Sequence, residues 1–383
     1  MPLETVIDAR RLRDFGIGTY IRNLTRALAR QDSENRYTLV VKPEDADTVE
    51  RLGPNFRVVP FARPETHILH NLTFPQFLRS FKANLYHIPL NYVAWWMPQP
   101  YVLTIHDMSS LLYPTHHELR NTLHEQRFRR GATRAERVIA VSESTRRDVE
   151  SVLHVPSERI RVIYSAPDPA FLLGGYDPKA DLQVLERYSI TLPFLLYAGA
   201  IRAQKNVPRL VEAFAVLRHE LERHPIYRDL KLVIIGDELS KYPSLRRTVR
   251  ETRVEQAVRF LGFVPSETLK VFYRAASAFA FPSLYEGFGL APLEAMSCGT
   301  PVVASNIPAL VEAAGDAAEW VNPDNVFDIA RGLRTVLLDM DRRVELSELG
   351  RERALHFSWD QTAKAVLGVY AEAAGVRKSS ATI

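Results

Sequence analysis

FPSLYEGFGLAPLEAMSCGTP, residues 281–301, carries the strongest structural signal in the chain. It follows the apolar run AFAF and opens with a bend at Pro282. Pro292 is tolerated in the first turn of a helix, because its missing N–H would be unpaired there anyway. Gly299 suits the left-handed residue that ends a helix, and the apolar VVAS that follows is typical of a buried strand. The stretch therefore predicts a loop, a helix and a strand of an α/β sheet.

Two carboxylates flank the glycines of this stretch. Gly287 and Gly289 let the backbone approach a ligand closely. Their N–H groups, with that of Leu290, lie at the predicted helix N-terminus, where a phosphate is favoured. Glu294, expected in the first helical turn, suits a neutral diol such as ribose, and Glu286 faces whatever lies beyond the phosphates. These groups fit a nucleotide-sugar, although the spacing alone fits an exposed loop with two surface glutamates equally well.

The segment closely resembles the E-x7-E signature of the retaining glycosyltransferases of GT-B fold, and in particular the mannosyltransferases of glycosyltransferase family 4 (glycosyl transferases group 1). The match includes Phe288 and the flanking FPS and CGTPVVAS. The resemblance implies an α/β protein with two Rossmann-like, doubly wound domains that face an interdomain cleft. It also implies that Glu294 holds the ribose, that Glu286 binds the donor sugar, and that the loop with Phe288 contacts the donor.

The composition is that of a globular protein, with 383 residues, 46% apolar residues and 25% charged residues, which is enough for two domains of ordinary size. The single cysteine, Cys298, excludes an intrachain disulfide and suits a reducing compartment. The N-terminus lacks a signal-peptide pattern, and no apolar run is long enough to span a membrane. We therefore expect a cytoplasmic protein. The net charge of +4 permits loose attraction to anionic lipid or nucleic acid without requiring either.

A second glycine loop lies near the N-terminus. Residues 4–8 predict a strand, and Gly16 and Gly18 precede an amphipathic helix. The third glycine of a dinucleotide fingerprint is missing, so a turn with purely conformational glycines is favoured when the pattern is taken alone. GIGTYIRNL resembles the N-terminal loop of the family. The resemblance implies that Gly16 and Gly18 approach the diphosphate and that Tyr20 approaches the acceptor.

A histidine follows one of the predicted buried strands of the first half. Residues 101–105 form that strand, and His106 and Asp107 follow its carboxyl end, where open α/β sheets bind ligands. A lone histidine at such a position is more often structural than catalytic. The resemblance implies that His106 lies beside the transferring sugar. VIAVSEST predicts a strand, a turn and a helix with Ser142 as N-cap, and Asp107 and Ser142 are acceptor-side candidates.

The first half also contains a basic segment and an aromatic loop. Residues 127–137, RFRRGATRAER, could attract anionic lipid headgroups or a lipid-linked acceptor, but a solvated helix face is favoured. Tyr92, Trp95 and Trp96 lie in a proline-bounded loop. They fit a cover over the acceptor, contact with a membrane interface, or a filled gap between domains, and the last of these is favoured.

Two D-x-D patterns could suggest a metal site. Asp45 and Asp47 lie in a charged segment that predicts a helix start with solvated acids, and we interpret the pattern at Asp339 and Asp341 in the same way. The resemblance also implies that no metal is needed. The sequence therefore predicts neither a metal site nor a cofactor.

In the second half, two cations follow a predicted strand. Arg202 and Lys205 lie at a strand-to-helix turn, where fixed donors could neutralise the charge that grows on a departing diphosphate. Surface cations are common, so this pattern alone does not establish a site. The sequence G-x-x-R-x-x-K-N that begins at Gly199 resembles the diphosphate-binding loop of the family. The resemblance therefore implies that Gly199, Arg202 and Lys205 contact the donor.

Two further strands complete the predicted donor site. KLVIIGDE, residues 231–238, predicts a buried strand that ends at Gly236, a typical ligand-facing position. VRFLGFVP, residues 258–265, predicts the next strand. In the family, the backbone after the latter strand meets the nucleotide base, and the matching residues are Phe263 and Val264. Because backbone contacts leave little trace in a sequence, the identity of the base stays open.

The predicted domains are residues 1–175 on the acceptor side and 185–355 on the nucleotide-sugar side, with a C-terminal helix, 356–376, that crosses back to the first domain. We expect a retaining hexosyltransferase that moves mannose from GDP-mannose to a glycan or a lipid-linked glycan, with no nucleic-acid partner. The alternatives are a UDP-sugar-dependent glucosyl- or similar transferase and an inactive nucleotide-sugar-binding subunit. The predicted catalytic residues are His106, Glu286, Arg202 and Lys205.

Overall fold

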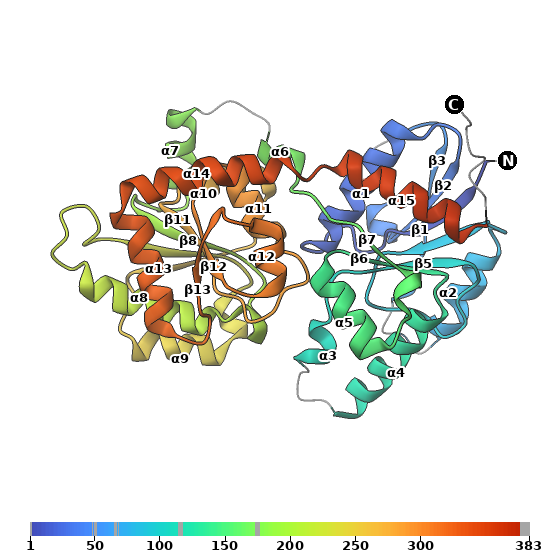
Figure 1. Ribbon diagram of the computed structural model, residues 1–383, viewed down its shortest axis with the longest axis horizontal. Coiled ribbons are helices and arrows are strands. Elements are labelled where there is room, and N and C mark those ends of the chain that lie inside the picture. Colours follow the sequence, from blue (N-terminus) through green and yellow to red (C-terminus); the bar gives the residue numbers. More distant parts are fainter. Residues whose placement is uncertain are drawn as a thin grey trace. The chain divides into compact units, whose positions relative to one another are not determined.

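The computed structural model describes residues 2–47, 49, 52–64, 67, 69–113, 118–172 and 177–375 (Figure 1). The chain forms two compact units, one made of Met1–Ser165 with Ser358–Ile383 and the other of Ala166–Phe357. The chain therefore passes from one unit to the other twice. Among the described residues, no helix is long and apolar enough to cross a membrane.

The described part of the first unit contains a parallel sheet in the order β3-β2-β1-β4-β5-β6-β7. Its central strands are buried along almost their whole length, as expected for a parallel sheet covered on both faces. The strands are β1 (Glu4–Asp8), β2 (Arg36–Val41), β3 (Phe56–Pro60), β4 (Leu85–Ile88), β5 (Tyr101–Ile105), β6 (Arg137–Ala140) and β7 (Ile160–Val162).

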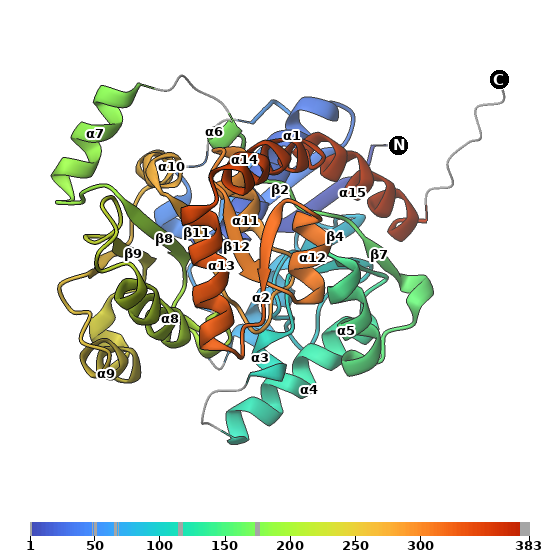
Figure 2. The ribbon, with the colours of Figure 1, turned by 60° about the vertical axis from the view of Figure 1, so that its left-hand side comes forward.

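Helices cover this sheet, and the last of them comes from the far end of the sequence (Figures 1 and 2). Helix α1 buries one apolar face that includes Ile21, Leu24 and Leu28. The helices are α1 (Ile17–Gln31), α2 (His70–Arg79), α3 (Ser109–Leu112), α4 (Glu118–Arg134), α5 (Glu143–Leu153) and α15 (Trp359–Ala373), with 3₁₀ turns at Pro43–Asp45 and Ser157–Arg159.

The second unit repeats this plan. Its described residues form a parallel sheet in the order β10-β9-β8-β11-β12-β13. The strands are β8 (Phe194–Gly199), β9 (Lys231–Gly236), β10 (Val258–Gly262), β11 (Ala278–Phe281), β12 (Val302–Ser305) and β13 (Ala318–Val321). The helices are α6 (Pro169–Leu172), α7 (Pro178–Arg187), α8 (Val207–Glu220), α9 (Pro243–Glu251), α10 (Ser266–Ala275), α11 (Leu290–Ser297), α12 (Pro308–Ala314), α13 (Val326–Leu338) and α14 (Met340–Leu355), with 3₁₀ turns at Ala203–Lys205 and Leu239–Lys241.

Both sheets have the strand order of a doubly wound Rossmann-like fold, so the predicted fold class is confirmed. The order reverses between β1 and β4 in the first unit and between β8 and β11 in the second. Ligands of such sheets bind outside the carboxyl ends of the strands at this reversal. The loops after these four strands are therefore where a site is expected.

The junction between the units differs from the predicted one. The sequence analysis placed residues up to 175 in the first domain, whereas the second unit begins at Ala166. The physical reason is the packing of α6 on α10 and α11. The Lys270 ammonium donates to the carbonyl of Ala170 at 2.5 Å, and the ring of Phe171 packs edge-on against Tyr273. The thiol of Cys298 lies 3.8 Å from the Phe171 carbonyl, and burial raises the pKa of this thiol to about 12.

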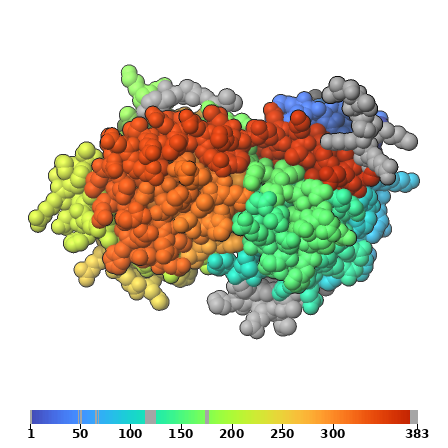
Figure 3. Space-filling model, in the orientation of Figure 1, coloured from blue at the N-terminus to red at the C-terminus, as the bar shows by residue number. Residues whose placement is uncertain are grey.

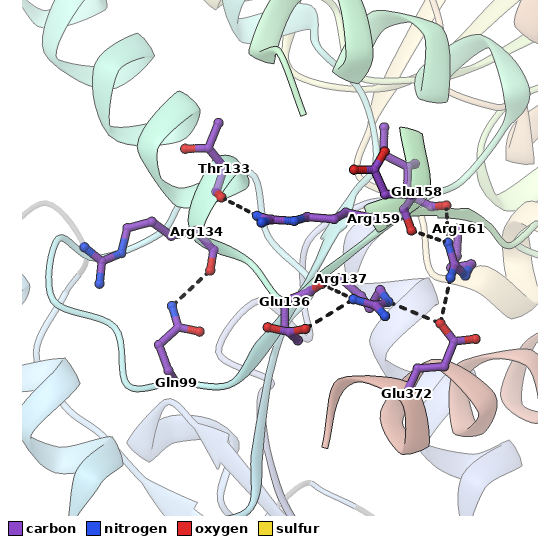
Figure 4. Close-up of polar contacts among 10 residues, drawn as sticks. Gln99, Thr133, Arg134, Glu136, Arg137, Glu158, Arg159, Arg161 and Glu372 are labelled. Carbon is purple, nitrogen blue, oxygen red and sulfur yellow. Dashed lines mark hydrogen bonds and ion pairs between the residues drawn. The ribbon is translucent and has the colours of Figure 1, made fainter. Parts of the chain in front are cut away.

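Helix α15 is part of the first unit, as expected for a helix that returns to the first domain. At its start, the hydroxyl of Thr362 donates to the carbonyl of Tyr164 at 2.7 Å, so the two connections between the units lie together on the first unit. Figure 3 shows the C-terminal stretch in red bordering the green surface that precedes residue 165. At the other end of α15, the carboxylate of Glu372 accepts hydrogen bonds from Arg137 and Arg161 (Figure 4).

Candidate active site

The loop after β8 carries the predicted cations. Arg202 is exposed, and no described residue pairs with its guanidinium. Asn206 adopts the left-handed conformation, and its amide donates to the carbonyls of Pro282 at 3.0 Å and Pro323 at 2.8 Å. A backbone hydrogen bond from Leu284 to Gln204 adds a further link. The loop after β8 is thus fixed to the loop after β11, its neighbour at the strand reversal.

This arrangement brings Lys205 and Glu286 together. The ammonium nitrogen lies 2.6 Å from one oxygen of the Glu286 carboxylate and 2.7 Å from the other. Only 20% of the Lys205 side chain and 10% of the Glu286 side chain are exposed, so water screens the pair weakly. Two predicted catalytic residues therefore neutralise each other in this structure. A diphosphate that approached Lys205 would compete with Glu286 for the ammonium.

Gly199 and Gly236 have a structural explanation. They end the neighbouring strands β8 and β9, lie opposite each other in register, and both have a φ of 152°. A Cβ on Gly236 would lie 2.0 Å from the carbonyl oxygen of Gly199. At Gly236 the two strand ends approach so closely that a side chain has no room, whereas at Gly199 the φ of 152° favours glycine. Donor contacts of these two residues remain a prediction.

The glycine loop after β11 leads directly into α11. Gly289 has a φ of 127°, which favours glycine, and it is the N-cap of α11 without a side-chain capping bond. Helix α11 begins at Leu290, so its first N–H groups are the predicted anion-binding groups. Phe288 is buried, and its ring packs edge-on against Phe357 at 5.4 Å, so this side chain holds the glycine loop on the core of the second unit. Phosphate contacts by Gly287 remain a prediction.

Glu294 lies one turn later than expected. The sequence analysis placed it in the first turn of the helix, but α11 starts at Leu290 and no acidic residue occupies its first turn. The reason is that Pro292 is the third residue of the helix, so Glu294 is the fifth. The hydroxyl of Tyr273 donates to the Glu294 carboxylate at 3.4 Å. Burial and the nearby Glu294 charge raise the pKa of Tyr273, which keeps this phenol protonated and able to donate.

The predicted base-binding residues differ in exposure. Phe263 is 68% exposed, whereas Val264 is buried, and a contact of these two residues with the base remains a prediction. Near them, the carboxylate of Asp237 accepts hydrogen bonds from the N–H of Ile201 at 3.1 Å and from the hydroxyl of Tyr242 at 2.9 Å. Asp237 thereby fixes the backbone next to Arg202. The sequence analysis missed this residue, and its position directly after Gly236 at a strand end was the available signal.

In the first unit, His106 follows β5 and is partly exposed. Its Nε2 lies 3.2 Å from the carbonyl oxygen of Pro89, which follows β4. A carbonyl only accepts, so Nε2 carries the proton and Nδ1 is an acceptor. Desolvation lowers the pKa of His106 to about 4, despite opposing effects of Asp107 and the Pro89 carbonyl. His106 is therefore neutral at pH 7, and its Nδ1 could accept a hydrogen bond from a sugar hydroxyl.

Asn91 was missed by the sequence analysis, although it holds the peptide groups around His106. Its amide oxygen lies 3.4 Å from the His106 N–H, and its amide nitrogen donates to the Asp107 carbonyl at 3.0 Å. The only signal in the sequence is a polar residue three positions after a buried strand. Arg10, which the sequence patterns also did not indicate, forms a buried bidentate ion pair with Asp8 at the end of β1, at 2.8 and 2.6 Å.

The N-terminal glycines differ from each other in role. Gly16 is exposed, has a φ of 67° and has open space where a Cβ would lie, so its conformation alone requires glycine. Gly18 is buried, and a Cβ there would lie 2.3 Å from the carbonyl oxygen of Leu12. Gly18 thus allows the loop before α1 to pack closely. An approach of these glycines to the diphosphate remains a prediction.

The three acceptor-side candidates have other partners in the structure. Tyr20 is fully buried, and its hydroxyl lies 3.3 Å from the Thr104 hydroxyl. Ser142 is also fully buried, and it caps α5 by accepting from the N–H of Thr145, as the predicted N-cap should. Asp107 accepts hydrogen bonds from the N–H and the hydroxyl of Ser109, at 2.9 and 2.6 Å. Burial therefore withdraws the side chains of Tyr20 and Ser142 from an acceptor, because α1 and α5 turn them into the core.

Comparison with known proteins agrees with this geometry. Residues 16–171 match the model described as Glycosyltransferase Family 4, and residues 188–353 match the model described as Glycosyl transferases group 1. The chain is 31% identical over 301 residues to O-antigen chain mannosyltransferase B of Escherichia coli, which covers 76% of this chain and 75% of that relative. The chain belongs to the family 4 glycosyltransferases.

Other relatives of this glycosyltransferase differ in length or in sequence. The serotype-specific mannosyltransferase WbdA of Escherichia coli is 32% identical over 231 residues, which are 60% of this chain and 28% of that protein. The solved structure of Anabaena HepE in complex with UDP-glucose has a TM-score of 0.76 at 17% identity, and the match covers 96% of this chain and 99% of that one. This structural similarity shows that the glycosyltransferase has the GT-B fold.

The D-x-D patterns of the glycosyltransferase have structural partners. Asp45 is buried and accepts a hydrogen bond from Arg13, so the expectation of a solvated acid was wrong at this position. Asp339 caps α14 by accepting from the N–H of Arg342 at 3.0 Å. Within the described parts of the chain, no group of three His, Cys, Asp or Glu side chains could hold a metal ion.

The aromatic loop of the glycosyltransferase packs on the basic face of α4. The Arg127 guanidinium lies over the rings of Tyr92 and Trp95, and Arg130 also lies over Trp95, at 5.0–5.9 Å. Trp96 is 55% exposed. Two of the three aromatic side chains thus have partners within the first unit, and the filling of a gap between domains stays a prediction. A small pocket at this place is lined by Trp95, Met97, Tyr101, Arg127, Arg130 and Arg134, among others.

Proposed function

We propose that this glycosyltransferase transfers mannose from GDP-mannose, with retention of the anomeric configuration, to a growing surface polysaccharide or a lipid-linked glycan. The observation that carries the proposal is the contact of Lys205 with Glu286 at the strand reversal of the second unit, with the exposed Arg202 beside it. Two cations that suit a diphosphate, Arg202 and Lys205, then lie on the loop next to the one that carries Glu286, whose carboxylate suits sugar hydroxyls. The identity to O-antigen chain mannosyltransferase B supports the choice of mannose.

The proposed chemistry needs no protein base. The acceptor oxygen attacks the anomeric carbon on the face from which the diphosphate departs, and the bond between that carbon and the phosphate oxygen breaks. The electron pair goes to the phosphate oxygen, which takes the proton of the acceptor hydroxyl. Arg202 and Lys205 stabilise the charge of the departing diphosphate, as fixed donors do in other group transfers. We propose that the reaction is metal-independent, since these cations supply the positive charge.

The remaining residues position the donor. Glu294 holds the ribose, with Tyr273 donating to its carboxylate. Glu286 leaves Lys205 when the diphosphate arrives and accepts hydrogen bonds from the sugar hydroxyls. The neutral imidazole of His106 accepts one further hydroxyl at Nδ1, because its Nε2 proton is committed to the Pro89 carbonyl. His106 therefore acts as a hydrogen-bond acceptor and not as a proton donor.

The test is a thermal-shift comparison of GDP, UDP and ADP and their common sugar conjugates, with EDTA present. A ligand at about 100-fold its Kd stabilises a protein by about 2.7 kcal/mol, which is visible as a higher Tm. We expect the largest shift with GDP and GDP-mannose, followed by transfer of mannose in the presence of EDTA. A shift with UDP-glucose but not with GDP-mannose would favour a UDP-sugar-dependent glucosyltransferase. UDP-glucose is the ligand in the solved HepE complex.

We also propose that the first unit binds the surface of an anionic membrane through α4. Arg127, Arg130 and Arg134 lie on one helical face beside Trp95, and among the described side chains no carboxylate forms an ion pair with them. Such arginines, with the exposed Trp96 next to Trp95 in the sequence, suit anionic headgroups at a lipid interface. The double change Arg130→Glu and Arg134→Glu should abolish cosedimentation with phosphatidylglycerol vesicles. The exposed pair Arg223→Glu and Arg228→Glu is the control, and equal binding by both variants would refute this proposal.

A further inference from the structure

A chain of buried polar side chains crosses the interior of the first unit. The Tyr370 hydroxyl of α15 lies 2.7 Å from Nδ1 of His87, and Nε2 of His87 lies 2.8 Å from the Thr104 hydroxyl. Thr104 in turn lies 3.3 Å from the hydroxyl of Tyr20. All four side chains are at most 1% exposed. Buried polar networks of this kind fix side-chain orientations, because an unpaired member is costly.

This chain of contacts ends at His106. The ring of Tyr20 packs edge-on against the His106 imidazole, with 4.8 Å between the ring centroids. Thr104 lies two residues before His106 at the end of the same strand, β5. On its other side, Tyr20 packs edge-on against Trp359, the first residue of α15, at 5.7 Å. Helix α15 therefore reaches the surroundings of His106 by two routes, through Trp359 and through Tyr370.

Because His87 is neutral, its hydrogen bonds with Tyr370 and Thr104 run in the same sense along the network. Burial, and secondarily the charge of a protonated His106, lowers the pKa of His87 to about 3, so this imidazole is neutral at pH 7. A neutral imidazole donates through one nitrogen and accepts through the other. The hydrogen bonds thus run either from Tyr370 through His87 to Thr104 or in the opposite sense. Removal of the Tyr370 hydroxyl leaves Nδ1 of His87 without this partner.

We propose that Tyr370 is a positioning residue for His106, which it holds in place through His87, Thr104 and Tyr20. The inference rests on the proposed function, in which His106 contacts the donor sugar. The last turn of α15 is fixed close by, since Glu372 bridges Arg137 and Arg161 at 3.2 and 2.9 Å (Figure 4). The C-terminal helix then contributes to the transfer site through the position of His106.

The experiment is the variant Tyr370→Phe, studied by ¹⁵N NMR of the histidine rings and by steady-state kinetics with GDP-mannose. We expect changed ring-nitrogen shifts of both His87 and His106, and a kcat lowered about tenfold with little change in KM for the donor, since the donor contacts of the second unit are untouched. Tyr101→Phe is the matched control, because it removes a buried hydroxyl that donates to the Gly131 carbonyl at the other end of β5.

A second pair of variants covers a possible loss of folding. Thr104→Val breaks the network, whereas Thr104→Ser keeps the hydroxyl, so Ser but not Val should preserve the His106 signals and turnover. Unchanged His106 signals and turnover in Tyr370→Phe would overturn the inference. If the signals change but the wild type transfers no mannose, the proposed function fails and the positioning role stands, because the NMR measurement needs no donor.

Discussion

At the scale of single residues, the contact between Lys205 and Glu286 is the central feature of the second unit. The sequence supplied both residues but gave them separate tasks, on the diphosphate and on the sugar. The structure adds that the two side chains form an ion pair at 2.6 Å. Sequence spacing could not reveal this contact, because it depends on the adjacency of β8 and β11 in the sheet.

We predict that Glu286→Gln tightens the binding of free nucleoside diphosphate by about tenfold while it lowers turnover. The amide no longer competes for the Lys205 ammonium, but it also loses the charge that would hold the sugar hydroxyls. Lys205→Ala should instead weaken diphosphate binding and lower turnover by roughly 10²–10³. Calorimetry with GDP and UDP provides the measurement.

The control for this prediction is Glu220→Gln, which removes the partner of Arg334 in a surface ion pair. This change should leave diphosphate affinity as it is. Weaker diphosphate binding in Glu286→Gln would show that the ion pair does not compete with the ligand.

At the scale of elements, most of the fold followed from the sequence. The strands at 4–8 and 101–105 lie where they were expected, because buried parallel strands are short runs between turn residues. The position of Glu294 within α11 was misplaced, since Pro292 is tolerated at any position of the first turn. Burial of Tyr20 was not foreseeable either, because a tyrosine on an amphipathic helix suits the core and a site equally well.

We predict that Gly236→Ala lowers the free energy of unfolding of the second unit by about 2–4 kcal/mol. The new Cβ would collide with the Gly199 carbonyl at 2.0 Å, and the φ of 152° is unfavourable for alanine. Gly368→Ala in the interior of α15 has open space around the new Cβ and should stabilise its helix by about 0.5–1 kcal/mol. Urea denaturation measures both. Equal stabilities of the two variants would contradict the close approach of β8 and β9.

At the scale of the whole molecule, the residues on either side of Ser358 pack in different units. Before it, Phe357 packs against Phe288 of the glycine loop in the second unit. After it, Trp359 packs against Tyr20 in the first unit. The sequence predicted a returning helix at 356–376 but not these contacts, because ring packing between distant residues leaves no local pattern.

We predict that the first unit loses stability as the pH falls from about 6.5 towards 4. The pKa values of His106 and His87 are lowered to about 4 and about 3 in the folded protein, whereas an unfolded histidine titrates near 6.5. Between these values the unfolded chain binds more protons, so the free energy of unfolding falls by about 1.4 kcal/mol per pH unit for each histidine, and this contribution is fully present above pH 6.5. Thermal unfolding at pH 7, 6 and 5 measures the effect. His87→Gln should flatten the dependence, and an unchanged slope in that variant would exclude His87 as a source.

The double passage of the chain between the units has a consequence for synthesis. The ribosome produces residues 1–165 first, but the helix that bonds to His87 and packs on Tyr20 emerges only after all of residues 166–357. At ~5–20 residues per second, this delay lasts roughly 10–40 s. During that time, the apolar surface of the N-terminal half that α15 later covers stays exposed. The second unit is continuous in sequence and can fold as it leaves the ribosome. The unit that is made first is therefore the unit that is finished last.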